Sequence, residues 1–99
     1  MITNLLVTIT AYCSCTICCG SKATGLCADG HKPQQGITVA ASRHFHLGSH
    51  LTINGVTNTF TIQDHLAKQF DGRVDVYFQS HKDALKWGKQ TNWITIYDK

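Results

Sequence analysis

Residues 73–78, RVDVYF, alternate apolar and polar side chains in the way that is typical of a half-buried β-strand. Val74, Val76 and Phe78 share one face of this segment, and Asp75 and Tyr77 share the other. Aspartate is disfavoured in the middle of a strand, and here it interrupts a run of β-branched residues. We therefore expect the valines to fill a core, and Asp75 to lie on the outer wall with a specific role.

Five other short segments carry the same strand signals, being rich in Val, Ile, Thr and aromatic residues and bounded by turn residues. They are residues 5–12, 36–42, 50–53, 58–64 and 92–97. Asn54-Gly55 between two of them is a strong hairpin signal. Ser80, with Asp83 three residues later and Gly88 beyond, predicts one short capped helix.

Six short strands and one helix indicate an all-β fold, and closure into a small barrel is favoured because it removes exposed sheet edges. The 99 residues, 42% of them hydrophobic, are enough for one core and one domain over residues 1–99. The net charge is only +3, and the nine basic residues are scattered, so the sequence lacks the basic stripe of a nucleic-acid-binding protein. The N-terminus has no basic region typical of a signal peptide, and no apolar run approaches the ~20 residues of a membrane span.

The acidic residues are scarce and grouped. The chain has six Asp and no Glu, and three of the six, Asp64, Asp71 and Asp75, fall between positions 64 and 75. Asp71 belongs to an Asp-Gly pair and is interpreted as a solvated turn residue. Strand alternation puts Asp64 on the face of Phe60 and Ile62, so we expect it to be partly withdrawn from water.

Several motifs together are similar to those of one known family. Thr10-Ala11-Tyr12 ends the first strand and precedes the cysteine-rich CSCTICCG (13–20), followed by ATG (23–25) and AASRHFHLGS (40–49). Asp64 and Asp75 are separated by ten residues, with Asp75 inside RVDVYF, and DALKWG (83–88) follows. The chain thus resembles the three-aspartate domain of bacterial and phage cell-wall lytic transglycosylases, related to the barrel of membrane-bound lytic transglycosylase A. This resemblance implies a six-stranded double-psi β-barrel.

The resemblance also implies roles for individual residues. It makes Asp75 the general acid/base and Asp64 its supporting carboxylate in cleavage of the MurNAc-β-1,4-GlcNAc bonds of peptidoglycan, with a 1,6-anhydro product. The pKa of Asp75 must then be raised, either by a like charge such as Asp64 or by apolar surroundings. Two positions depart from the family pattern: Ser42 replaces its first Asp, and DHLA (64–67) replaces Asp-x-Gly-Gly. We expect substrate contacts from Tyr12, Ser42, His65, Arg73 and Tyr77.

The expected context is a phage or prophage lysin, an endolysin or a virion-associated enzyme, that reaches the periplasmic cell wall after delivery or release. Its partner is the peptidoglycan glycan strand, and we expect a monomer that needs no cofactor. Two other functions stay open: a non-catalytic, expansin-like glycan-binding barrel and a small zinc-binding interaction domain. Four aromatic residues are candidates to stack on sugar rings: Tyr12, Tyr77, Trp87 and Trp93. For Trp87, on the apolar side of the predicted helix, packing in the core is the first expectation.

The cysteines allow more than one interpretation. Cys13, Cys15, Cys18, Cys19 and Cys27 include one Cys-x-x-Cys pair with metal-knuckle spacing, so a structural zinc is an alternative to free or disulfide-linked cysteines. Four ligands within one short loop are sterically awkward, and a strong zinc signature uses two separated pairs. His44, His46 and His50 are interpreted as surface or substrate-contacting residues rather than as metal ligands.

Overall fold

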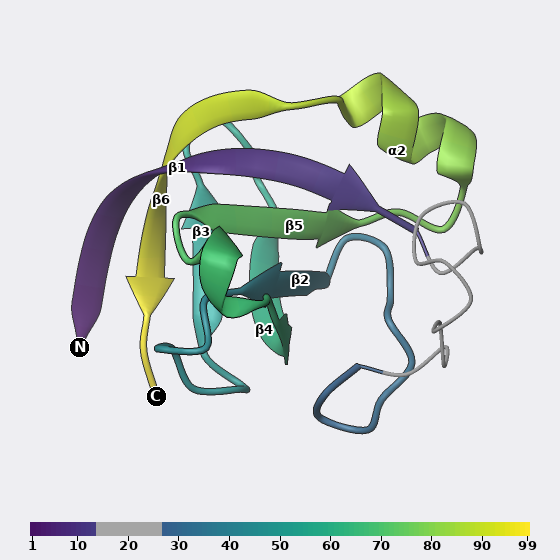
Figure 1. Cartoon of the computed structure of the whole chain (residues 1–99). Coiled ribbons are helices and arrows are strands. Elements are labelled where there is room, and N and C mark those ends of the chain that lie inside the picture. The colour runs from purple at the N-terminus through teal and green to yellow at the C-terminus, as the bar shows by residue number, and fades with distance from the viewer. Residues whose placement is uncertain (14–26) are drawn as a thin grey trace.

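The computed structural model describes residues 1–13 and 27–99. In this part of the chain six strands close into a barrel in the order β1-β5-β2-β4-β3-β6 (Figure 1). The strands are β1 Ile2–Tyr12, β2 Thr38–Ala41, β3 His50–Ile53, β4 Thr59–His65, β5 Arg73–Tyr77 and β6 Gln90–Tyr97; the helix α2 spans His81–Trp87 and the 3-10 turn η2 spans Lys68–Phe70. The predicted strands, helix and closed barrel are confirmed.

The strand pairing has an internal symmetry that the sequence does not show. Strands β1 and β5 are parallel, as are β4 and β2, whereas β1 with β6, and β4 with β3, are antiparallel. The remaining pairs, β2 with β5 and β3 with β6, are antiparallel. Exchanging β1, β2 and β3 with β4, β5 and β6 therefore leaves the whole pairing scheme unchanged.

The predicted hairpin and helix caps are both present. Strands β3 and β4 pair as a hairpin, and the Val56 amide donates to the Ile53 carbonyl at 2.9 Å across the Asn54-Gly55 turn. The side chain of Ser80 caps α2 by accepting from the Asp83 amide, and Gly88 ends the helix with φ of 69°. That positive φ suits glycine, which lacks a Cβ. Among the described residues, no helix is long and apolar enough to cross a membrane.

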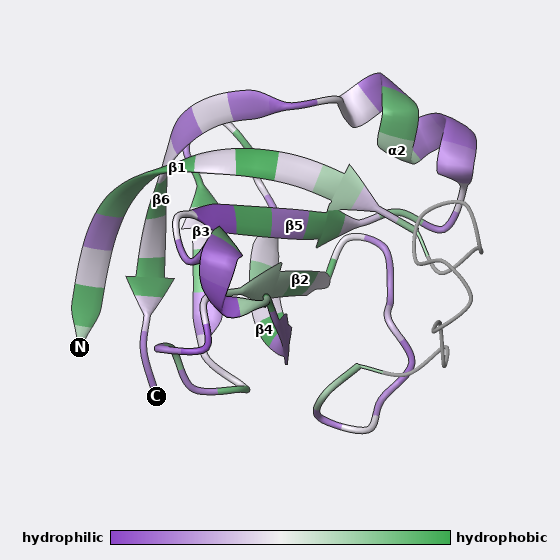
Figure 2. Cartoon of the chain, in the orientation of Figure 1, coloured by the Kyte–Doolittle hydropathy of each residue, from purple (hydrophilic) through white to green (hydrophobic). Residues whose placement is uncertain are grey.

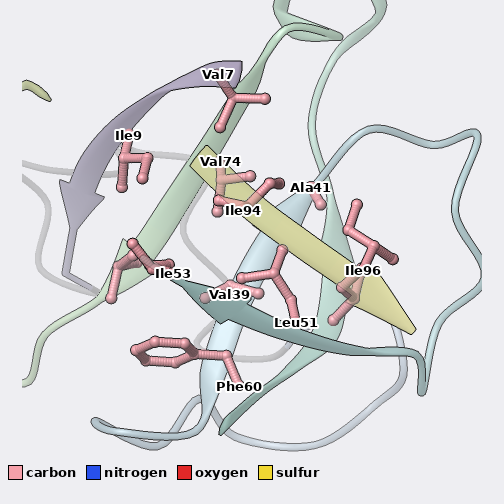
Figure 3. Close-up of a cluster of buried hydrophobic side chains, with 12 residues drawn as sticks. Val7, Ile9, Val39, Ala41, Leu51, Ile53, Phe60, Val74, Ile94 and Ile96 are labelled. Carbon is pink, nitrogen blue, oxygen red and sulfur yellow. The ribbon is translucent and has the colours of Figure 1, made fainter. Parts of the chain in front are cut away.

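The barrel is filled by side chains from all six strands (Figure 3). Hydrophilic and hydrophobic residues alternate along β5 (Figure 2), and its Val74 and Val76 are each 2% exposed in the core. Ile9, Leu51, Ile62 and Ile96 are fully buried. The prediction that the valines of β5 fill the barrel, leaving Asp75 on its outer wall, is confirmed.

The orientation expected for Asp64 is wrong, because β4 contains an irregularity. Val39 of β2 pairs with Ile62, but the next residue, Ala40, pairs with Asp64, so Gln63 is an extra residue in β4. One inserted residue reverses the alternation of faces beyond it. Asp64 therefore lies on the outer face beside Ala40 and not on the core face of Phe60 and Ile62, but it is partly buried there, as expected.

Truncation of a core side chain should lower the free energy of unfolding much more than truncation of an exposed one. Ile96 is completely buried, so Ile96→Ala should lower the free energy of unfolding by about 2–5 kcal/mol, through lost burial and the cavity left behind. Leu85 on α2 is 68% exposed, and Leu85→Ala should change the free energy by no more than about 0.5 kcal/mol. Urea unfolding measures both. Equal effects of the two substitutions would contradict this assignment of the core.

Candidate active site

The candidate site is a row of residues across the outer wall formed by β1, β5, β2 and β4. Thr10 pairs with Asp75, Asp75 with Ala40, and Ala40 with Asp64. Directly paired residues in neighbouring strands point to the same face, so both acids flank the small side chain of Ala40. Neighbouring strands are ~4.8 Å apart, which separates the backbones of the two aspartates by roughly 9–10 Å.

Asp75 is the more unusual of the two acids. Its Oδ1 is buried and has no hydrogen-bond partner among the residues described. The buried Oγ1 of Thr10, in the paired residue of β1, likewise lacks a partner in this part of the chain. Burial raises the pKa of Asp75 above its ordinary value of 3.8, and the positive charge of Arg73 opposes this shift. A raised pKa of this origin is typical of a carboxyl group that must hold a proton.

Asp64 has a different environment. Its Oδ1 accepts hydrogen bonds from the backbone amides of Ala28, at 3.2 Å, and His65, at 3.0 Å. Asp64 is not among the causes of the raised pKa of Asp75, where burial dominates. Of the two causes considered from the sequence, withdrawal from water therefore accounts for the shift, and the like charge of Asp64 does not. The separation of the two strands explains this, since Ala40 lies between the acids.

Asp71 is more than the solvated turn residue expected from its sequence. Ser42 is 3% exposed, and its hydroxyl donates to Asp71 Oδ1 at 3.2 Å. The Nε2 of His44 lies 3.1 Å from Asp71 Oδ2. Asp71 thus places a carboxylate against Ser42. Ser42 is the position at which the family pattern that the sequence resembles has its first aspartate. These three side chains are not a nucleophilic triad, because Ser42 donates to the carboxylate and not to the imidazole.

Of the other predicted contact residues, Tyr12, Arg73 and Tyr77 share the outer face with Asp75, whereas His65 pairs with Ala41, which faces the core. His65 Nε2 is 2.7 Å from the carbonyl oxygen of Phe45, and the Arg73 guanidinium lies 4.7 Å from the centre of the Phe70 ring. The rings of Tyr12 and Tyr77 meet edge to face, with centroids 5.5 Å apart. Tyr77 also borders a surface hollow of about 340 Å³, which is further lined by Pro33, Gln34, Gln35 and Gln79.

The described cysteines do not favour a metal site. Cys13 is disulfide-bonded and so cannot be a thiolate ligand. Cys27 is a free, buried thiol, and its pKa is raised to about 11 by burial and by the negative charges of Asp64 and Asp29. Predictions for Cys15, Cys18 and Cys19, and for the motif at 23–25, lie outside the described residues. Within residues 1–13 and 27–99, no group of three or more His, Cys, Asp or Glu side chains could hold a metal ion.

The three clustered histidines have separate partners. His44 contacts Asp71, His46 Nδ1 lies 3.4 Å from Asp98 Oδ1, and His50 Nδ1 lies 3.3 Å from the hydroxyl of Thr61. They do not converge on one point, as ligands of a single metal ion would.

No family model matches this chain, and no curated protein matches it either.

The raised pKa of Asp75 predicts the direction in which pH changes the free energy of unfolding. The folded state binds this proton more tightly than the unfolded state, so the contribution of Asp75 to stability decreases as the pH rises from 3.8 toward the raised value. Asp75→Asn should therefore be at least as stable as the wild type at pH 7, and any advantage should disappear below pH 3.8. Urea unfolding over a pH series measures this.

Asp98 provides a control, because its effect on stability should have the opposite dependence on pH. The hydrogen bond from Ser49 lowers its pKa, so Asp98→Asn should lose stability at neutral pH, and this loss should fade as the pH falls below 3.8. A marked loss of stability for Asp75→Asn at pH 7 would contradict the stated electrostatics of Asp75.

The contact between Ser42 and Asp71 gives a further prediction. Ser42→Asp would place a second carboxylate in a nearly buried position against Asp71, and should destabilise the fold by about 3 kcal/mol or more. The double variant Ser42→Asp with Asp71→Asn removes the repulsion and should recover much of this loss, as measured by urea unfolding. Equal stabilities of the single and double variants would show that the two positions do not interact.

Proposed function

We propose that this protein is a lytic transglycosylase that cleaves the glycan strands of peptidoglycan on a double-psi β-barrel. The symmetric pairing scheme supports the barrel assignment: two parallel pairs, β1 with β5 and β4 with β2, meet at the antiparallel pair of β2 with β5. The resemblance of the sequence motifs to those of the three-aspartate family supports the activity. The proposed setting is a phage-derived enzyme acting on the cell wall.

One observation carries the proposal: Asp75 is a half-buried carboxyl group on the outer wall, with a raised pKa and a buried oxygen that has no described partner. An unpaired buried carboxylate is costly for the fold, so its retention is expected where it does chemistry. The adjacent hollow beside Tyr77 offers space for a sugar unit on the same face, two residues along β5.

The proposed reaction uses Asp75 twice. Protonated Asp75 donates its proton to the glycosidic oxygen as the bond from that oxygen to the anomeric carbon of MurNAc breaks. The Asp75 carboxylate then accepts the proton of the C6 hydroxyl of the same sugar, whose oxygen bonds to the anomeric carbon. A 1,6-anhydro ring forms, Asp75 regains its proton, and no water is consumed.

Asp64 has a supporting role in this scheme. It lies on the same wall, and its orientation is fixed by two backbone amides. Its negative charge can stabilise the positive charge that develops at the anomeric carbon, without itself receiving a proton. Asp71 and Ser42 lie at the end of the same wall, where β2 leads into the loop before β3 and η2 leads into β5.

A glycan-binding barrel without catalysis is the second candidate. Specific contacts favour it: Ser42 supplies no acid of its own and its hydroxyl is engaged by Asp71, while Asp64 is held by the backbone. In that case Asp75 would contact the glycan without transferring a proton.

Digestion of purified sacculi followed by mass spectrometry tests the proposal. The wild type should release 1,6-anhydromuramic products, and Asp75→Asn should lower the rate by about 10²–10⁴-fold because the general acid is lost. Asp83→Asn, at the exposed start of α2, is the matched control and should keep the wild-type rate.

The products separate the alternatives. Reducing ends would indicate a hydrolase, and binding without products would indicate the non-catalytic barrel. Undiminished activity of Asp75→Asn would refute the assignment of this residue.

A further inference from the structure

A groove of about 490 Å³ lies on the part of the barrel opposite the acids. Its residues come from β1, β6 and β3 and from the turn after β3: Asn4, Thr52, Asn54, Trp93 and Thr95. In the closed strand order β6 is three strands away from β2 in either direction. The groove, called here the Trp93 groove, is therefore separate from the wall that carries Asp75 and Asp64.

The strand register builds the floor of the Trp93 groove. Asn4, Thr95 and Thr52 form one row across β1, β6 and β3, because Thr95 pairs with both of the others. Trp93 lies two residues before Thr95 on β6, on the same face, and its side chain is 54% exposed. A large indole is thus held in water beside a row of small polar side chains.

Hydrogen bonds hold these groups in position. The Thr95 hydroxyl donates to Asn4 Oδ1 at 2.8 Å, which directs the amide NH₂ of Asn4 away from Thr95 as a donor. Asn92 Nδ2 donates to the Asn54 carbonyl at 2.9 Å, and the Asn54 amide donates to the Trp93 carbonyl at 3.0 Å. These bonds fix the side chains of Asn4 and Thr95 and the backbone at Asn54 and Trp93, so this part of the groove is preorganised for a ligand.

The chemistry of the Trp93 groove is that of neutral-sugar recognition. Its lining contains two amides, two hydroxyl groups and one indole, and no ionisable side chain. Phosphates and other anions are recognised by Arg, Lys or helix N-termini, which this lining lacks. A pyranose ring instead offers an apolar C–H face to an aromatic ring, and hydroxyl and acetamido groups to amides and hydroxyls.

We propose that the Trp93 groove is a second glycan-binding site, which takes an N-acetylhexosamine segment of the glycan strand. This inference rests on the proposed function for the identity of the glycan, but binding here requires no catalysis. A segment bound at β6 lies on the side of the barrel away from Asp75, so the groove would hold the enzyme on the polymer while other strands reach the candidate active site.

The test uses the Asp75→Asn protein, in which cleavage is blocked, and the soluble tetramer of N-acetylglucosamine as the probe. Nuclear magnetic resonance follows the indole N–H of Trp93 and the backbone amides of Asn4 and Thr95 during titration. We expect saturable shifts of these signals. Adding Trp93→Ala should weaken the affinity reported by Asn4 and Thr95 by about tenfold, through loss of the stacking surface.

Tyr97→Ala is the matched control. Tyr97 is on the same strand and face, is 44% exposed, and does not line the Trp93 groove, so this substitution should leave the affinity unchanged. Absence of shifts at the groove, or equal affinities of the Trp93→Ala and Tyr97→Ala proteins, would overturn the proposal. So would sedimentation showing that Trp93→Ala converts a dimer into a monomer, because the groove would then be an interface between copies.

The activity assay distinguishes this inference from the proposed function. If the wild type releases no products from sacculi but binds the tetramer through Trp93, the catalytic proposal fails and the second site stands. If the wild type cleaves and Trp93→Ala cleaves and binds equally well, the second site fails and the catalytic proposal stands.

Discussion

The pairing of β2 with both β5 and β4 is the constraint on which the fold and the candidate site depend. All four residues of β2 are buried, and Val39 and Ala41 point into the core. The strand joins the two symmetry-related halves, being antiparallel to β5 and parallel to β4. The same hydrogen-bonded row sets Ala40 between Asp75 and Asp64. If β2 moved by one residue relative to its neighbours, a core residue of β2 would lie between the two acids and Ala40 would turn toward the core.

Most of the barrel could be predicted from local patterns, because each strand and the helix are specified by neighbouring residues. The alternation in RVDVYF places Val74 and Val76 in the core, and Ser80 and Gly88 delimit α2. The face of Asp64 could not be predicted, since the extra residue Gln63 appears only when β4 is paired with β2. Symmetric pairing is likewise a property of the assembled barrel and has no counterpart in repeated sequence.

The two acids of the candidate site could be chosen from the sequence as candidates, but the groups that surround them could not be predicted. Aspartate within a β-branched strand drew attention to Asp75, and burial raises the pKa of this residue. The link from Asp71 to Ser42 joins positions that are distant in sequence, and an Asp-Gly pair gives no sign of it. The amide of Ala28 that binds Asp64 comes from a segment with no motif at all. Such contacts depend on tertiary packing, which a single sequence does not encode in any local pattern.

The wall that carries Asp75 and the Trp93 groove differ in how much their side chains cost the stability of the fold. Asp75 is partly withdrawn from water, and one of its oxygens has no hydrogen-bond partner among the described residues, a costly arrangement that the two proposed proton transfers would use. The Trp93 groove is neutral, open to solvent and held by hydrogen bonds between β1 and β6, and between β6 and the turn after β3, an arrangement that costs the fold little. Binding of glycan in the Trp93 groove would raise the local concentration of glycan near Asp75 without requiring tight binding at Asp75 itself. Under the proposed function, weak binding of the glycan beside Asp75 would leave the interactions there for the transition state, which is where they would increase the rate.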